Sequence, residues 1–148
     1  MKLSTFTDYN LRVLLYLAAH QDRLSTIQEI ALAYNISENH LMKVIHHLAK
    51  NDLILSIRGK GGGIRLHRAP SELNLGKIVR LAEQKGPIVE CLGDKNKCCI
   101  APSCRLPSAL NDAFNSFYET LSKYTLADVM IDGATMQPLL AKTEKGAA

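Results

Sequence analysis

The chain has 148 residues and a formal net charge of +4, and 47% of its residues are hydrophobic. This length fits one small domain with a long accessory helix, and the hydrophobic content is sufficient for a core. The N-terminus has no apolar stretch typical of a secretion signal, and no apolar run approaches the ~20 residues of a membrane span. We therefore expect a cytoplasmic protein with no membrane partner, in which thiols stay reduced.

The positive charge is concentrated in one window of the sequence. Residues 39–68 contain six basic side chains and one acidic side chain, whereas residues 1–38 are slightly acidic and residues 69–148 are neutral overall. A basic patch of this kind is typical of a surface that binds a phosphate backbone. A solvated basic face would give the same charge pattern, so the elements that carry the patch decide between the two interpretations.

Helical spacing of apolar residues predicts helices over about 7–20, 26–33 and 37–50. The predicted N-terminal signals are Thr7 or Asp8, the segment 25–28, which resembles a capping box, and Ser37. A short helix, a three-residue turn and a capped second helix are typical of a helix-turn-helix. An ordinary helical hairpin would have a similar pattern.

A glycine-rich hairpin is predicted next. Residues 53–57 and 64–66 have the composition of two strands, and the connecting residues 58–63 are Arg-Gly-Lys-Gly-Gly-Gly. The glycines let the tip approach another backbone closely, and the segment lacks the spacing of a nucleotide-binding P-loop. A basic hairpin after a helix-turn-helix predicts a winged helix, so the expected fold class is mainly α with a small β-hairpin wing.

The winged helix predicts which residues face DNA. The helix over 37–50 would enter the major groove, where Asn39 or Lys43 is suited to reading adenine or guanine. The wing would add phosphate or minor-groove contacts, and binding should weaken steeply with salt. The predicted DNA-binding residues are Ser37, Asn39, His40, Lys43, Arg58, Lys60, Gly61 and Arg65.

The rest of the chain divides into further segments. A helix is predicted after Ser71 or Asn74 and ends before Gly86–Pro87, and a long helix is predicted over about 106–124 with a further turn over 126–130. The long helix has one apolar stripe, which could belong to the core or face a twin subunit. The predicted organisation is a DNA-binding domain over 1–87, a cysteine loop over 88–104, a dimerisation helix over 105–131 and a flexible tail over 132–148.

All four cysteines lie in one polar segment, as Cys91, Cys98, Cys99 and Cys104. Such a segment is poorly suited to burying thiols and well suited to folding them around an ion or cluster. Zinc ligands usually come in close Cys-x2-Cys pairs, whereas the gaps here are wider and favour an iron–sulfur cluster. A zinc site and a disulfide switch remain open. No catalytic triad, paired carboxylates or nucleotide fingerprint indicates an enzyme.

Four segments resemble one bacterial family: LSTFTDY at 3–9, NHLMKVI at 39–45, RGKGGGIRL at 58–66 and KYTLAD at 123–128. It is the family of winged-helix iron–sulfur transcriptional regulators, and over about residues 1–130 the chain looks most like its nitric-oxide-sensing repressors, the NsrR type. The resemblance implies a homodimer that binds a palindromic DNA operator. It also implies a 4Fe–4S cluster whose reaction with nitric oxide releases the DNA.

The resemblance further implies the cluster ligands, which are three cysteines and an acidic residue from the partner subunit. The corresponding positions here are Cys91, Cys98, Cys104 and Asp8. Cys99 is an additional thiol that could replace its neighbour. The related IscR type uses a histidine three residues after the last cysteine, where this chain has Pro107, so a site of that kind is not implied. The alternative is a cluster-free DNA-binding regulator that responds to redox state through a disulfide.

Overall fold

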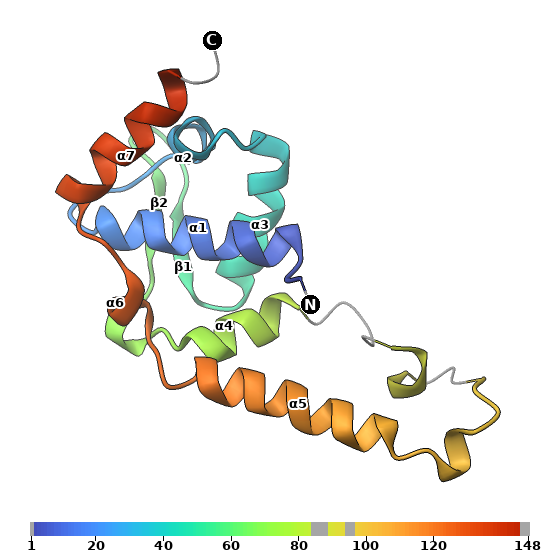
Figure 1. Cartoon of the computed structure of the whole chain (residues 1–148). Coiled ribbons are helices and arrows are strands. Elements are labelled where there is room, and N and C mark those ends of the chain that lie inside the picture. The colour runs from blue at the N-terminus through green and yellow to red at the C-terminus, as the bar shows by residue number, and fades with distance from the viewer. Residues whose placement is uncertain (1, 84–88, 94–96, 146–148) are drawn as a thin grey trace.

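The computed structural model describes residues 2–83, 89–93 and 97–145 of the chain. This part contains seven α-helices and one two-stranded antiparallel sheet (Figure 1). The helices α1 to α7 span Thr5–Ala19, Ile27–Tyr34, Glu38–Lys50, Leu75–Ala82, Leu106–Leu121, Leu126–Val129 and Gly133–Lys145, and the strands β1 and β2 span Ile54–Ile57 and Gly63–Leu66. None of the described helices is both long enough and apolar enough to cross a membrane. The predicted fold class is confirmed.

Side-chain caps determine where the first four helices begin. Ser4 accepts a hydrogen bond from the Thr7 N–H at 3.1 Å, so α1 starts at Thr5, earlier than the predicted caps Thr7 and Asp8. The prediction was wrong because a hydroxyl three residues upstream satisfies the first turn before Thr7 is reached. The remaining caps are Thr26 for α2, Ser37 for α3 and Asn74 for α4.

The hydrophobic core lies around α1, which contacts α3, α4, α6 and β2 (Figure 1). The apolar faces of α1, α2, α3 and α4 point toward this centre, as the periods of their sequence patterns predict. Fully burying a leucine side chain contributes roughly 1.5–3 kcal/mol. The side chains with no exposed surface at this centre include Val13, Leu14, Ile30, Leu41, Val44, Leu48 and Leu126.

A tight turn joins α2 to α3. Asn35 adopts a left-handed conformation with φ of 51°, and the Ile36 N–H donates to the Ala31 carbonyl at 3.0 Å. Ile36 is buried, which fixes the angle between the two helices. This geometry matches the predicted helix-turn-helix.

The wing is attached directly to the helix-turn-helix. β1 pairs with β2 from Ile54–Leu66 to Ile57–Gly63. On the other side of β2, Ser25 and Ile64 exchange two backbone hydrogen bonds of 2.9 and 2.7 Å, which tie the hairpin to the residue before the α2 cap. The hairpin therefore moves with the start of α2.

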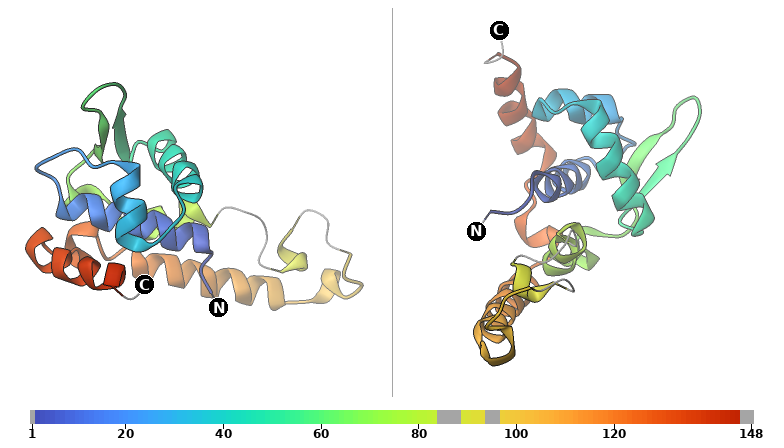
Figure 2. Two further views of the ribbon diagram at one scale, coloured as in Figure 1. Left: turned by 90° about the horizontal axis from the view of Figure 1, so that it is seen from above. Right: turned by 90° about the vertical axis from the view of Figure 1, so that its right-hand side faces the viewer.

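α4 and α5 cross closely at Gly76. A Cβ at this position would overlap the Ser122 hydroxyl and come within 2.5 Å of the Tyr118 carbonyl oxygen, so the approach requires glycine. The Arg80 guanidinium lies over the Tyr118 ring, 4.3 Å from its centroid, and Asn74 donates to the Ser122 carbonyl at 2.7 Å. Away from this crossing, α5 extends beyond the rest of the molecule (Figure 2).

The last helix replaces the flexible tail that the sequence predicted for 132–148. α7 contacts α2, and Met136 is only 4% exposed (Figure 1). Asp132 supports the start of α7 by accepting from the Thr135 N–H at 2.9 Å. Pro138 lies inside the helix, where it removes a backbone donor, but the contact with α2 outweighs this weak local preference. Residues 146–148 and the predicted boundary at 87 and 88 lie outside the described residues.

Candidate DNA interface and cysteine segment

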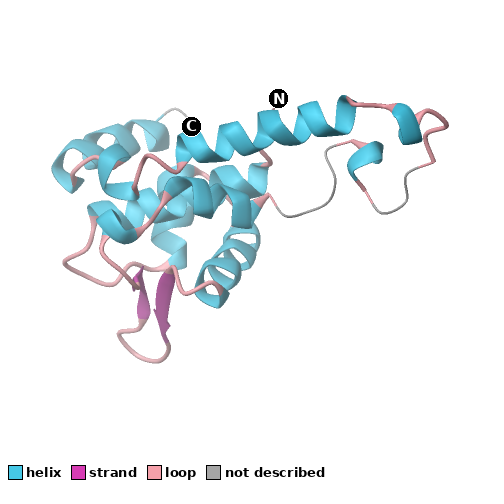
Figure 3. Ribbon diagram, turned by 90° about the horizontal axis from the view of Figure 1, so that it is seen from below, coloured by secondary structure: helices cyan, strands magenta, loops and turns pink. Residues whose placement is uncertain are grey.

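The residues predicted to bind DNA lie on one face of the molecule. α3 and the hairpin project on the same side, and α5 lies on the opposite side (Figures 2 and 3). All of the predicted residues are exposed: Ser37, Asn39, His40, Lys43, Arg58, Lys60, Gly61 and Arg65. The structure therefore brings the two predicted groups, from α3 and from the wing, to a common surface.

α3 divides into a buried and an exposed side. Its inner side carries Leu41, Val44, Ile45 and Leu48, all of them buried. Its outer side forms a shallow hollow lined by Asn39, Met42, Lys43 and His46. Sequence reasoning missed Met42 and His46, although each lies three residues from a predicted one and helical spacing places it on the same side. Donors, an apolar group and a cation on one helix face are the residue types that read base edges.

The wing presents its charges without internal neutralisation. Gly61 has φ of +79°, and the Gly62 N–H donates to the Gly59 carbonyl at 2.9 Å to close the tip. Among the described residues, no ion pair involves the basic side chains of the wing or Lys43. These cations are therefore available to phosphate groups, as backbone positioning on DNA requires.

Aromatic contacts hold α3 against the start of α1. The Phe6 and His47 rings meet edge to face with centroids 5.1 Å apart, and the Tyr9 and His40 rings lie 6.3 Å apart. His40, a predicted DNA-binding residue, thus also contacts α1. The orientation of α3 is linked through these rings to the first two turns of α1.

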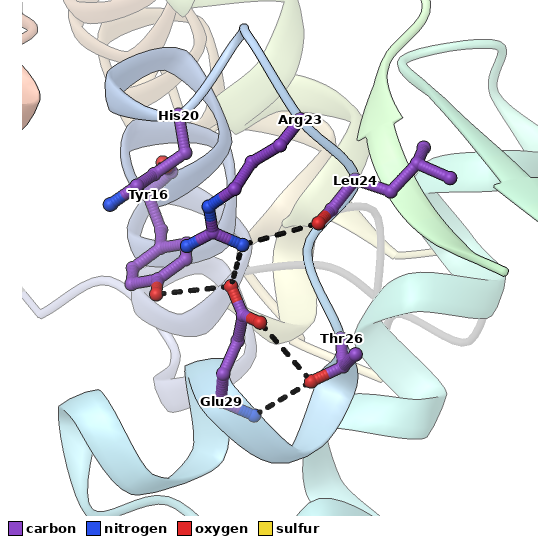
Figure 4. Close-up of polar contacts among 6 residues, drawn as sticks. All are labelled: Tyr16, His20, Arg23, Leu24, Thr26 and Glu29. Atoms are coloured by element: carbon purple, nitrogen blue, oxygen red, sulfur yellow. Dashed lines mark hydrogen bonds and ion pairs between the residues drawn. The ribbon is translucent and has the colours of Figure 1, made fainter. Parts of the chain in front are cut away.

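A polar network holds α2 on the other end of α1 (Figure 4). Tyr16 donates to Glu29 Oε1 at 3.2 Å, and Arg23 Nη1 donates to the same oxygen at 2.7 Å. Burial opposes ionisation of Glu29, but hydrogen bonds, chiefly from Arg23, outweigh it and lower its pKa. Burial and the nearby Glu29 carboxylate raise the pKa of Tyr16, which keeps its hydroxyl as a donor. α1 therefore supports both helices of the helix-turn-helix, because the ring contacts hold α3 and this polar network holds α2.

The described residues of the predicted cysteine segment, 89–93 and 97–104, lie at the N-terminal end of α5, away from the wing (Figures 1 and 2). Its described residues form two short 3-10 turns, Glu90–Leu92 and Ala101–Ser103. Cys98 and Cys99 are exposed and Cys91 and Cys104 are half-buried, and no disulfide joins them. No group of three His, Cys, Asp or Glu side chains placed to hold a metal ion occurs among the described residues.

Asp8 lies on α1 and not in the cysteine segment. Its carboxylate pairs with Arg12 at 2.9 Å, and 47% of its side chain is exposed. One subunit therefore does not bring the four predicted ligands together. The donor set still fits an iron–sulfur cluster, because soft thiolates are the ligands such clusters use and none of these thiols is buried in the core.

Comparison with known proteins shows which family the chain belongs to. The sequence profile of the Rrf2 family, described as an iron-dependent transcriptional regulator, matches residues 3–132. The HTH-type transcriptional regulator NsrR of Bacillus subtilis is 46% identical over 146 residues, which cover 97% of this chain and 100% of that protein. NsrR of Halalkalibacterium halodurans is 44% identical over 142 residues, which cover 95% of this chain and 97% of that protein.

Solved structures agree with the sequence relatives. T. potens IscR superposes with a TM-score of 0.68 at 28% identity, covering 86% of this chain and 85% of that one. CymR, the global cysteine regulator of B. subtilis, superposes with a TM-score of 0.60 at 28% identity, covering 87% of this chain and 95% of that one.

The resemblance read from the four sequence segments is confirmed by these matches, and so is the prediction that the chain is not an enzyme. The fold, the exposed basic face of α3 and the wing, and relatives that match over nearly their full length all describe a DNA-binding transcriptional regulator. The chain belongs to the Rrf2 family of transcriptional regulators.

Proposed function

We propose that the chain acts as a homodimeric repressor that holds a 4Fe–4S cluster and releases a palindromic operator when nitric oxide reaches it. The observation that carries this proposal is the cysteine segment. It gathers every thiol of the chain into one accessible stretch between α4 and α5, in a protein whose relatives are named NsrR over nearly their whole length.

The cluster ligands would be Cys91, Cys98 and Cys104 of one subunit with Asp8 of the partner subunit. The thiols are outside the core and in no disulfide, so ligation would not disturb the packing of the domain. Asp8 is half-exposed and paired only at the surface with Arg12, so its carboxylate can exchange that weak contact for another. A bound cluster supplies iron sites with which nitric oxide reacts.

The dimer would form along α5. This helix has no buried residue in the single subunit, although it carries an apolar stripe that includes Phe114 and Phe117. Leu106, at its start, is 55% exposed. A second subunit would cover the stripe and bring the two cysteine segments and the two DNA-binding faces under one symmetry axis.

The proposed dimer would bind DNA through two α3 helices in successive major grooves. The half-sites of such proteins lie about one helical turn apart, roughly 34 Å, so a small change in the separation of the two helices weakens binding at both. Asn39 and Lys43 would contact bases, and the wing cations would contact phosphates. The residues of α1 set the separation, because α1 carries both Asp8 and the rings that orient α3.

The test compares two neighbouring cysteines. The parent protein, Cys98→Ala and Cys99→Ala are purified without oxygen, and their visible spectra, iron and sulfide contents are measured. Affinity for a duplex that the protein selects from a random-sequence pool is measured before and after nitric oxide. We expect about four irons per chain in the parent and in Cys99→Ala, a loss of the cluster in Cys98→Ala, and a loss of DNA affinity after nitric oxide in the first two.

Two results would contradict the proposal. A colourless parent protein that stays iron-free after anaerobic reconstitution would exclude the cluster. An iron-free parent that releases DNA when an added oxidant removes two hydrogen atoms from a pair of its thiols, seen as a mass loss of about 2 Da, would identify a disulfide switch instead.

A further inference from the structure

One carboxylate joins the end of α4 to the start of α1. Glu83 Oε1 accepts hydrogen bonds from the Ser4 N–H at 2.7 Å and from the Thr7 hydroxyl at 2.5 Å. Thr7 has no exposed surface, so its hydroxyl depends on partners within the protein. Hydrogen bonds to an ionised group in a partly buried setting are stronger than neutral ones.

Glu83 also lies at the end of α4, the last helix before the cysteine segment. It is the C-terminal cap of α4, and Cys91 follows eight residues later. The same carboxylate contacts the turn of α1 that contains Asp8 and Phe6. Glu83 therefore connects the end of α4, the last helix before the cysteine segment, with the first turn of α1.

The other side of that turn faces α3. Phe6 and Tyr9 contact His47 and His40 of α3 through their rings. Because a close-packed interior transmits strain, a displacement of the first turn of α1 would change the orientation of α3. The contacts form one continuous series from Glu83 through α1 to the DNA-binding helix.

We propose that Glu83 is a positioning residue that couples the state of the cysteine segment to the orientation of α3 within the same subunit. The inference rests on the proposed function, because it needs a cysteine segment with two states. It adds a route inside one chain to the route through Asp8 of the partner subunit. Cluster binding in the cysteine segment would act on Glu83 at the end of α4. Glu83 would then hold the start of α1, and α1 would hold α3 in its DNA-binding orientation.

The quantity that tests this coupling is a ratio of dissociation constants. Operator affinity is measured for cluster-free and cluster-loaded protein, and the ratio of the two constants is compared among the parent, Glu83→Ala and Glu83→Gln. Typical couplings between sites are about 5–150-fold. We expect Glu83→Ala to bring the ratio at least about fivefold closer to one without changing iron content, and Glu83→Gln, which keeps an acceptor oxygen without the charge, to lie between.

A matched control separates coupling from a general loss of stability. Glu72→Ala removes a carboxylate that accepts a hydrogen bond from the Ala69 N–H at 3.1 Å within its own turn. Its ratio should equal that of the parent. Thr7→Val removes one of the two hydrogen bonds to Glu83 with little change of volume and leaves the bond from the Ser4 N–H, so its ratio should lie between those of the parent and Glu83→Ala. It replaces Glu83→Ala as the test if that variant does not fold.

A second readout does not depend on DNA. Hydrogen exchange of the amides in the first turn of α1 should slow on cluster loading in the parent and change little in Glu83→Ala. A parent that holds no cluster overturns the proposed function and this inference together. A parent that switches, with unchanged ratios and unchanged exchange in Glu83→Ala and Thr7→Val, overturns this inference alone.

Discussion

The winged-helix part of the chain and the arm formed by the cysteine segment and α5 are built differently. The first has a core in which seven or more side chains have no exposed surface, and caps and hydrogen bonds fix each of its helices. In the second, no described residue of the cysteine segment or of α5 is buried. The first region is stabilised by its own contacts, whereas the second leaves its apolar and thiol groups accessible to binding.

The largest loss of stability is expected when a leucine of the core is truncated. Leu48 has no exposed surface and lies on the inner side of α3, so Leu48→Ala should reduce the free energy of unfolding by about 2–5 kcal/mol. Denaturant unfolding measures the loss. Leu32→Ala on α2 is the control, because Leu32 is 63% exposed and its truncation should cost less than about 0.5 kcal/mol. Equal losses would contradict the description of the core.

An added charge on α5 should weaken dimer formation more than it destabilises the folded subunit. Leu106→Glu places a carboxylate on the exposed leucine at the start of α5, and we expect the dimer dissociation constant to rise about tenfold or more. Sedimentation measures the change. Ser108→Glu adds the same charge in the same turn, on a different side of the helix, and should have little effect. A dimer that tolerates Leu106→Glu as well would show that α5 is not its interface.

The smallest effect is expected at the network that holds α2 on α1. The pKa of Glu29 is lowered in the folded protein, so its stabilisation is present above the ordinary glutamate value of about 4.3 and is lost as the pH falls through the folded pKa. Glu29→Gln should therefore be less stable than the parent at pH 7, by less than about 1 kcal/mol, and equally stable in acid. Urea unfolding over a pH series measures this, and a difference that grows toward low pH would reverse the assignment.

Local signals made the DNA-binding region predictable. The Ser37 cap, the amphipathic pattern of α3 and the glycines of the wing act over a few residues, so sequence alone gave their positions closely. The true cap of α1, Ser4, was missed because Thr7 and Asp8, three and four residues later, offered an equally good signal. α7 was missed because Gly133 and Pro138 are helix breakers locally, whereas its contact with α2 is a tertiary effect.

The candidate sites were predictable only in part. The spacing and polar surroundings of the cysteines identify a ligand set, but they do not show how the thiols converge, since a cluster and a second chain would contribute to that geometry. No local sequence pattern identified Glu83 as a positioning residue either. Its hydrogen-bond partners Ser4 and Thr7 lie 79 and 76 residues away in the sequence, and such a pairing emerges only when α1 and α4 come together.

The glycine at the α4–α5 crossing has a mechanical consequence. α5 has 16 residues, so it forms a rigid lever about 24 Å long with its fulcrum near Gly76. A tilt of about 5° at the fulcrum displaces the far end, which follows the last cysteine of the cysteine segment, by about 2 Å. The close contact that Gly76 allows therefore determines where α5 pivots on α4. A methyl group at position 76 would push the two helices apart and change how far the tip of α5 moves for a given tilt.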